Sequence, residues 1–296
     1  MASNTDQLTI KKILVPTDFS EISLHALNYA ARIAKLENSE IIMLHVFESY
    51  TQNTMLNMRI DFTEIVERGV EEKFKEIKAK NPDLEGVTIH SRVVVGKIHA
   101  EIDNTAAQEN VKLIVMGTHG VSGVTNIGKF IIGSNAYRTI QNAPCPIITL
   151  REVPHRREIK NIVVPLDSTR DSLKKMDIAI RWGKFLKAKI HVVAVTAFFE
   201  ELKGSVKHIE EKLHDVENKL KQEDIEYESQ IIRHHSPSDS VLEYAYKIHA
   251  DLIIIVTGQE AQWSEMLFGS SARNVISDSS IPVLSINIHE YQAARE

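Results

Sequence analysis

Short, continuous runs of apolar residues alternate along this chain with longer segments in which apolar residues recur at helical spacing. Such runs are typical of strands buried on both faces, as in a parallel sheet. The runs of the N-terminal half are residues 13–15, 41–46, 93–95, 113–116 and 147–150. The runs of the C-terminal half are residues 162–164, 190–195, 229–232, 252–256 and 283–286.

The segments between these runs predict helices. Ser20 stands where a helix N-cap is expected, directly ahead of an apolar helical face between residues 24 and 34. Residues 60–80 and 99–110 predict two further helices. Strands that alternate regularly with helices indicate the α/β class, with a doubly wound parallel sheet.

The pattern occurs twice. Residues 11–35 (KKILVPTDFSEISLHALNYAARIAK) resemble residues 160–184 (KNIVVPLDSTRDSLKKMDIAIRWGK), and residues 130–150 resemble residues 266–286. A tandem duplication of one domain explains both similarities. The charged stretch between the copies contains proline and lacks apolar periodicity, as an exposed linker does. The predicted organisation is a first domain at 1–150, a linker at 151–159 and a second domain at 160–296.

Composition narrows the classes of function. With 43% hydrophobic and 25% charged residues, the chain is expected to be a soluble globular protein. Its formal net charge of −5 offers no basic field for nucleic acid or an anionic membrane, so neither is an expected partner. The polar N-terminus lacks the apolar core of a signal peptide, which predicts a cytoplasmic protein. Cys145, between two prolines, is expected to be structural.

Glycines are concentrated behind the run 113–116. Five of the chain's twelve fall between residues 117 and 134. They do not form a P-loop, because Phe130 stands where a hydroxyl should hold magnesium, and no G-x-G-x-x-G follows a first strand. The spacing that fits is Gly120, two residues, Gly123, nine residues, then Gly133 and Ser134.

Together with ILVPTDFSE near the start, IVMGTHG before the glycines and APCPI before the last strand, this spacing resembles the universal stress protein (UspA-like) family. The resemblance covers nearly the whole chain, twice, as in the tandem members of that family. It implies a five-stranded, Rossmann-like parallel sheet in each copy, of the adenine nucleotide alpha hydrolase-like type with strand order 3-2-1-4-5. Many members with the glycine pattern bind ATP, whereas others lack it and bind none.

The family's strand order implies a ligand crevice between the first and fourth strands, where the order reverses. Backbone amides at the paired glycines, and the start of the helix behind the last one, would hold phosphate. Asp18 would accept hydrogen bonds from the nucleoside. Asp18 and Ser134 also stand where helix caps would, and two valines of the implied set fit plain strand core equally well. The cofactor-binding set that the resemblance implies is Thr17, Asp18, Val46, Val95, Met116, Gly117, His119, Gly120, Gly123, Gly133, Ser134 and Asn135.

The second copy departs from this pattern. Between residues 256 and 269 it is shorter, lacks the paired glycines and carries Glu260 and Glu265, whose carboxylates would repel phosphate. Asp167 and the Gly-Ser pair before the last helix remain. We therefore expect ATP, with or without Mg²⁺, in the first copy only. No catalytic and no metal-ligating residue is predicted.

Three classes of function compete. The first is a nucleotide-dependent stress-response or signalling module, which the glycine pattern favours. The second is a slow ATP hydrolase, and the third is a nucleotide-free scaffold or a metal binder using His234 and His235. By analogy with single-copy relatives, the last strands, 147–150 and 283–286, are expected to pair in an intramolecular pseudo-dimer, which also protects apolar sheet edges. A homodimer of two chains is left open.

Overall fold

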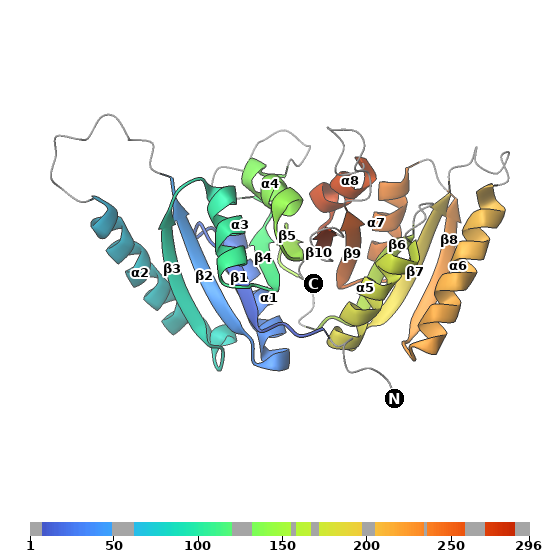
Figure 1. Cartoon of the computed structure of the whole chain (residues 1–296), viewed down its shortest axis with the longest axis horizontal. Helices are drawn as coiled ribbons and strands as arrows, with labels where there is room; N and C mark the ends of the chain where they lie inside the picture. Colours follow the sequence, from blue (N-terminus) through green and yellow to red (C-terminus); the bar gives the residue numbers. More distant parts are fainter. Residues whose placement is uncertain are drawn as a thin grey trace. The chain divides into compact units, whose positions relative to one another are not determined.

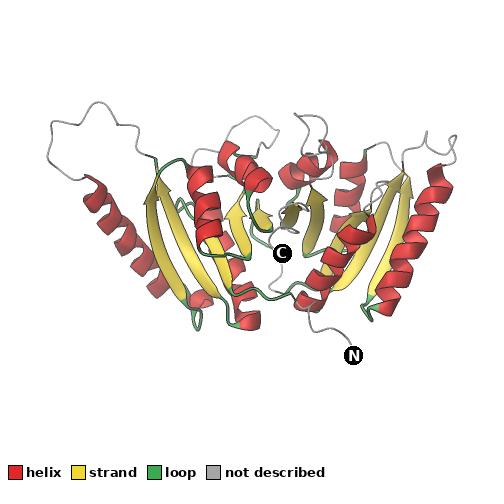
Figure 2. Cartoon of the chain, viewed as in Figure 1, coloured by secondary structure: helices red, strands yellow, loops and turns green. Residues whose placement is uncertain are grey.

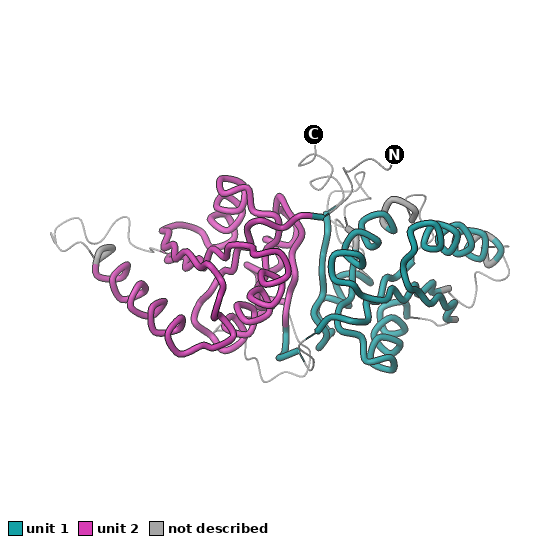
Figure 3. Tube along the Cα trace, turned by 90° about the horizontal axis from the view of Figure 1, so that it is seen from below, with its two compact units in different colours: residues 1–8, 151–296 teal, residues 9–150 magenta. Residues whose placement is uncertain are grey.

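The computed structural model describes residues 8–48, 62–119, 132–154, 158–166, 172–196, 205–233, 236–257 and 270–287. The chain divides into two compact units. The N-terminal unit spans Thr9–Leu150 and the C-terminal unit contains Arg151–Glu296, drawn in magenta and teal in Figure 3.

The N-terminal unit is built on a parallel sheet with the order β3-β2-β1-β4-β5, which confirms the predicted strand order (Figure 1). Both inner strands that meet where the order reverses, β1 and β4, are buried through their middles, because helices cover both faces of the sheet. The strands are β1 (Lys12–Pro16), β2 (Glu40–Phe47), β3 (Ile89–Val95), β4 (Leu113–Gly117) and β5 (Ile147–Leu150).

Figure 1 shows α3 and α4 on one face of this sheet and α1 on the other. Ser20 caps α1 as predicted, accepting a hydrogen bond from the Ser23 amide at 3.4 Å. Asn38 ends the same helix in the left-handed conformation with a φ of 54°. The helices are α1 (Glu21–Glu37), α2 (Phe62–Lys80), the short 3₁₀ turn η1 (Pro82–Leu84), α3 (Ile98–Gln108) and α4 (Ser134–Asn142).

β3 is longer than the apolar run that predicted it. Its first residues, Ile89 to Arg92, are mostly polar, and the strand lies at the edge of the sheet with much of its length open to solvent. An edge strand needs no continuous apolar run, so hydropathy located its end at Val95 and missed its start.

The C-terminal unit repeats the architecture, with strands flanked by helices as in the N-terminal unit (Figure 2). Its strand order is β10-β9-β6-β7-β8, in agreement with a tandem duplication. Its strands are β6 (Asn161–Leu166), β7 (Lys189–Thr196), β8 (Tyr227–Arg233), β9 (Leu252–Thr257) and β10 (Val283–Asn287). Its helices are α5 (Ser172–Leu186), α6 (Ser205–Gln222), α7 (Pro237–Lys247) and α8 (Ser270–Asp278). Among the described helices of both units, none combines the length and apolarity that a membrane span requires.

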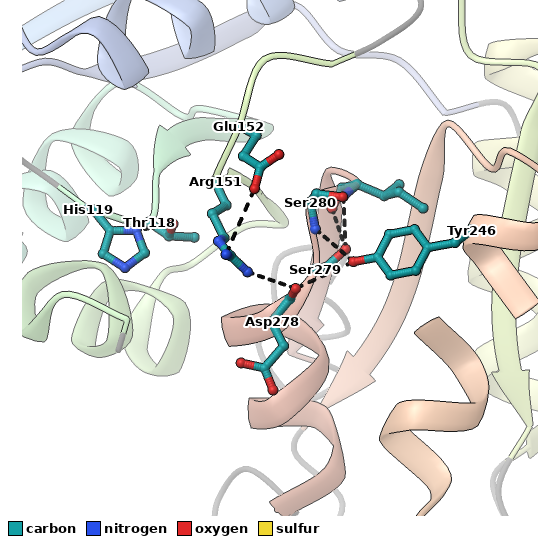
Figure 4. A network of polar contacts seen from close by, with 9 residues as sticks. Thr118, His119, Arg151, Glu152, Tyr246, Asp278, Ser279 and Ser280 are labelled. Atoms are coloured by element: carbon teal, nitrogen blue, oxygen red, sulfur yellow. Dashed lines mark hydrogen bonds and ion pairs between the residues drawn. The ribbon is translucent and has the colours of Figure 1, made fainter. Parts of the chain in front are cut away.

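Arg151 fixes the start of the C-terminal unit to the end of α8 (Figure 4). Its guanidinium donates to the Asp278 carbonyl oxygen at 2.8 Å, and the Tyr246 hydroxyl donates to the same oxygen at 3.4 Å. The Ser280 amide in turn donates to the Tyr246 hydroxyl at 3.1 Å. The last carbonyls of a helix have no partner within it, so Arg151 and Tyr246 supply the missing donors.

Asp103, on α3, is half-buried, and its buried Oδ1 atom has no hydrogen-bond partner among the described residues. Burial raises its pKa to about 7. Burial also raises the pKa of the Cys145 thiol to about 12, with Asp103 adding to the effect and Lys112 opposing it. Cys145 is therefore a neutral thiol, which fits the structural role expected for it.

The carboxyl of Asp103 should make stability fall as the pH rises. The unfolded carboxyl has the ordinary aspartate pKa of 3.8 and the folded carboxyl a pKa of about 7, so between these values the folded state holds the extra proton. Its contribution to the free energy of unfolding is therefore lost as the pH rises through this interval. Asp103→Asn should reduce the loss of unfolding free energy between about pH 5 and about pH 8. Urea unfolding followed by far-UV circular dichroism at the two pH values measures this loss. The same change at the exposed Asp215 on α6 is the control. Equal pH slopes for Asp103→Asn and the unmodified protein would contradict this account.

Candidate functional site

A cavity of about 480 Å³ opens at the carboxyl ends of β1 and β4 in the N-terminal unit. The two strands pair in parallel, Ile13 with Leu113 and Leu14 with Ile114, so both chains leave the sheet at the same edge. Strand order reverses at this point, which is where doubly wound sheets bind ligands. The volume is within the range of small-molecule sites.

The cavity brings together residues that are far apart in the sequence. Val95 is not among them: it ends β3 with 44% of its surface exposed. Gly120 and Gly123 lie outside the described residues. The nine other members of the predicted set line the cavity: Thr17, Asp18, Val46, Met116, Gly117, His119, Gly133, Ser134 and Asn135.

Sequence reasoning missed much of the apolar wall. Ile98 and Ile102 both line the cavity, and they lie four residues apart on one face of α3. Leu44 and Val46 line it from β2, where residues two apart share a face. These two spacings were the available signal. The lining residues outside the predicted set are Pro16, Ser23, Leu44, Ile98, Ile102, Thr118 and Ala136.

The turn after β1 is held by hydrogen bonds. The Thr17 amide donates to the Leu44 carbonyl at 2.8 Å, and the hydroxyls of Thr17 and Ser23 share a buried hydrogen bond of 2.9 Å. Asp18 Oδ1 accepts from the Ser20 amide at 3.0 Å. Asp18 therefore does not cap α1, since Ser20 does, and its exposed carboxylate stands at the cavity.

Thr118 ties the end of β4 to two neighbouring elements. Its amide donates to the Leu150 carbonyl of β5 at 2.8 Å, and its carbonyl accepts from the Gly133 amide at 2.9 Å. Its hydroxyl lies 2.7 Å from Nδ1 of His119 (Figure 4). This residue was not predicted, although it connects the strand end to the start of α4.

The first turn of α4 opens on the cavity. Gly133 is the N-cap and Ser134 is the first residue of the helix, so of the two roles considered for Ser134 the structure excludes that of the cap. Gly133 has an ordinary φ of −57° and supplies no side-chain cap. A Cβ there would lie 3.2 Å from the Thr118 carbonyl oxygen, so close backbone packing favours glycine.

Three backbone donors of α4 converge on the site. The amides of Ser134, Asn135 and Ala136 have no acceptor within the helix, because the first N–H groups of any helix lack one. All three residues line the cavity. The partial positive charge of a helix N-terminus favours an anion at this position. Among the described lining residues Asp18 is the one carboxylate, and none is a lysine or arginine. Among the described residues, an anion at this position would therefore meet backbone amides rather than lysine or arginine.

The corresponding parts of the C-terminal unit are incompletely described. Asp167, Glu260, Glu265 and Gly269 lie outside the described residues, as do His234 and His235. Ser270 begins α8 as Ser134 begins α4.

The universal stress protein family model matches residues 9–151 and 158–287. The chain belongs to this family.

Two universal stress proteins of Methanocaldococcus jannaschii illustrate the relationship. Universal stress protein MJ0531 is 32% identical over 147 residues, which cover 48% of this chain and 82% of the relative. Universal stress protein MJ0577 is 31% identical over 157 residues, which cover 48% of this chain and 94% of the relative. About half of this chain thus corresponds to one single-copy universal stress protein.

Solved structures of similar length share the whole tandem fold. A universal stress protein from Archaeoglobus fulgidus superposes with a TM-score of 0.72 at 20% identity, covering 95% of this chain and 99% of that one. A putative universal stress protein from Pseudomonas aeruginosa gives 0.64 at 16% identity, covering 97% and 99%. This chain therefore shares the two-unit fold of these structures along nearly its whole length.

Gly117 tests how closely β4 and α1 pack at the cavity. A Cβ at Gly117 would lie 2.9 Å from Ile22 Cγ2, so Gly117→Ala should lower the free energy of unfolding by about 1–3 kcal/mol. In an Ile22→Ala background the same change should cost much less, because the clashing atoms are gone. Urea unfolding followed by far-UV circular dichroism measures both costs.

Gly69→Ala is the matched control, since a Cβ there meets nothing within 4 Å and the residue lies in α2. It should be neutral or stabilising. An equal cost of Gly117→Ala in both backgrounds would show that Ile22 does not restrict the position.

Proposed function

We propose that the N-terminal unit binds ATP and that the chain acts as a nucleotide-dependent stress-response or signalling module. The observation that carries the proposal is the convergence of the Ser134, Asn135 and Ala136 amides on a cavity that also presents Asp18. An anion seat and a hydrogen-bond acceptor in one apolar-walled cavity suit a ligand with a phosphate part and a nucleoside part.

The phosphates would occupy the N-terminus of α4. Attraction of an anion to a helix N-terminus contributes only about 0.3–2 kcal/mol, so several amides must act together on a triphosphate. The turn that contains Gly120 and Gly123 would add further amides, with His119 beside it. The described lining contains no lysine or arginine, so among these residues the contacts to phosphate would come from backbone amides.

The nucleoside would occupy the apolar part of the cavity. Val46, Ile98 and Ile102 offer apolar surface for a base, and Met116 and Gly117 line the cavity at the end of β4. Asp18 would accept hydrogen bonds from the nucleoside, because a carboxylate repels phosphate but pairs with hydroxyl or amino donors.

The C-terminal unit would bind no nucleotide. Its sequence replaces the paired glycines with a shorter segment that carries Glu260 and Glu265, and carboxylates at a phosphate position would repel the ligand. In this proposal residues 1–150 form the nucleotide-binding domain, and residues 160–296 serve structure or partner binding. The pairing of the last strands of the two domains remains a prediction.

The proposal predicts about one ATP per chain by equilibrium dialysis with labelled nucleotide. Asp18→Asn should weaken binding by about tenfold, the loss expected when a hydrogen bond to a charged group is replaced. The corresponding change in the second copy, Asp167→Asn, is the matched control and should leave binding unchanged.

Two ATP molecules per chain would contradict the asymmetry between the copies. If ATP still binds after Gly120, Gly123 and Gly133 are all replaced by bulky residues, the proposal that backbone amides bind the phosphates is wrong. A nucleotide-free scaffold would bind no ATP in any of these samples.

A further inference from the structure

Phe19 has an unusual backbone conformation for a bulky residue. Its φ of 65° lies in the left-handed region, which strongly favours glycine or asparagine over an aromatic residue. The residue stands between Asp18 and the helix cap Ser20. Backbone strain of this kind persists only where surrounding contacts hold it, and it is concentrated at functional sites.

The side chain of Phe19 is held from two elements. Its ring stacks on His45 of β2 with centroids 4.9 Å apart and an interplanar angle of 25°. It also packs against Phe74 of α2 at 5.5 Å, and Phe74 is only 1% exposed. The ring is therefore anchored in the packing between the sheet and α2, which keeps the backbone of Phe19 in its strained conformation.

The same histidine holds the residue on the other side of Asp18. Nδ1 of His45 lies 2.8 Å from the Thr17 carbonyl oxygen, and because a carbonyl can only accept, Nδ1 carries the proton. The Phe19 amide donates to the Thr17 hydroxyl at 3.0 Å. Contacts of His45 thus constrain both neighbours of Asp18, while the amide and hydroxyl of Ser20 donate directly to Asp18 Oδ1. The turn as a whole places the carboxylate at the cavity.

Phe19 and His45 are not among the described residues that line the cavity. They can influence a ligand there only by fixing the turn that carries Asp18. We propose that Phe19, clamped by His45, is a positioning residue that sets the direction of the Asp18 carboxylate and so the affinity for the nucleoside part of the ligand. This inference rests on the proposed function, and it concerns residues that make no contact with the nucleotide.

A positioning role predicts different effects on the recognition of the nucleoside and of the phosphates. The amides of Ser134, Asn135 and Ala136 belong to α4, which holds neither Phe19 nor His45. Disturbing the aromatic clamp should therefore weaken recognition of the nucleoside and leave recognition of phosphate unchanged. A general loss of structure would instead weaken both.

The test measures the affinity of the whole chain for ATP and for inorganic tripolyphosphate by calorimetry. Phe19→Ala should weaken ATP binding by about tenfold, close to the effect of Asp18→Asn, and leave tripolyphosphate affinity unchanged. The double variant Phe19→Ala/Asp18→Asn should bind ATP no more weakly than Asp18→Asn alone, because both changes remove the same interaction.

Two further variants keep the test decisive if Phe19→Ala does not fold. Phe19→Gly adopts the left-handed conformation without strain but lacks the ring, and His45→Phe keeps an aromatic ring but loses the donor to Thr17. Each should weaken ATP binding and spare tripolyphosphate. Phe185→Ala, which removes the ring that packs on Trp182 at 5.8 Å in the C-terminal unit, is the control and should change neither affinity.

Normal ATP affinity in these variants would overturn the positioning role and leave the proposed function standing. Losses that add fully in the double variant, or equal losses for ATP and tripolyphosphate, would also overturn it. If the unmodified protein binds no ATP, the proposed function fails and this inference fails with it.

Discussion

The parallel pairing of β1 with β4 is the constraint on which the site depends. Strand order reverses between these two strands, so helices leave them toward opposite faces and a crevice opens at their carboxyl ends. Residues about a hundred positions apart, such as Asp18 and His119, meet there only because the two strands are in register. The buried apolar residues of β1 and β4, which hold the two strands in the sheet, are therefore as necessary to the site as the residues that line it.

Among the described lining residues, backbone amides and the Asp18 carboxylate give this crevice its polar chemistry. In the proposed function three amides at the start of α4 would attract an anion, and the described lining offers no lysine or arginine to help them. Gly117 allows the close approach of β4 to Ile22 of α1, and Gly133 allows the start of α4 to pack on the Thr118 carbonyl oxygen, since a Cβ at either position would crowd these neighbours. The aromatic clamp around Phe19 concerns the other part of the site, because in our proposal it fixes the turn that carries Asp18 and leaves the amides of α4 untouched.

The sequence predicts the α/β class, the duplication and the strand order because these follow from apolar runs and family motifs. It also predicts nine of the residues that line the cavity. It misplaces the start of β3, since an edge strand lacks a continuous apolar run. It also leaves open a capping role for Ser134, because hydroxyl residues are common caps, whereas the cap of α4 is Gly133. It misses Thr118 and the Phe19–His45 stack, whose importance lies in backbone hydrogen bonds and ring contacts that no local pattern records.

The most direct test of the account is a crystal structure of the whole chain grown with a non-hydrolysable ATP analogue. We predict one analogue per chain, with its phosphates on the amides of Ser134, Asn135 and Ala136 and its nucleoside beside Asp18 and Ile98. An analogue bound in the reverse orientation, bound only in the C-terminal unit, or absent from this cavity at saturating concentration would contradict the central claim.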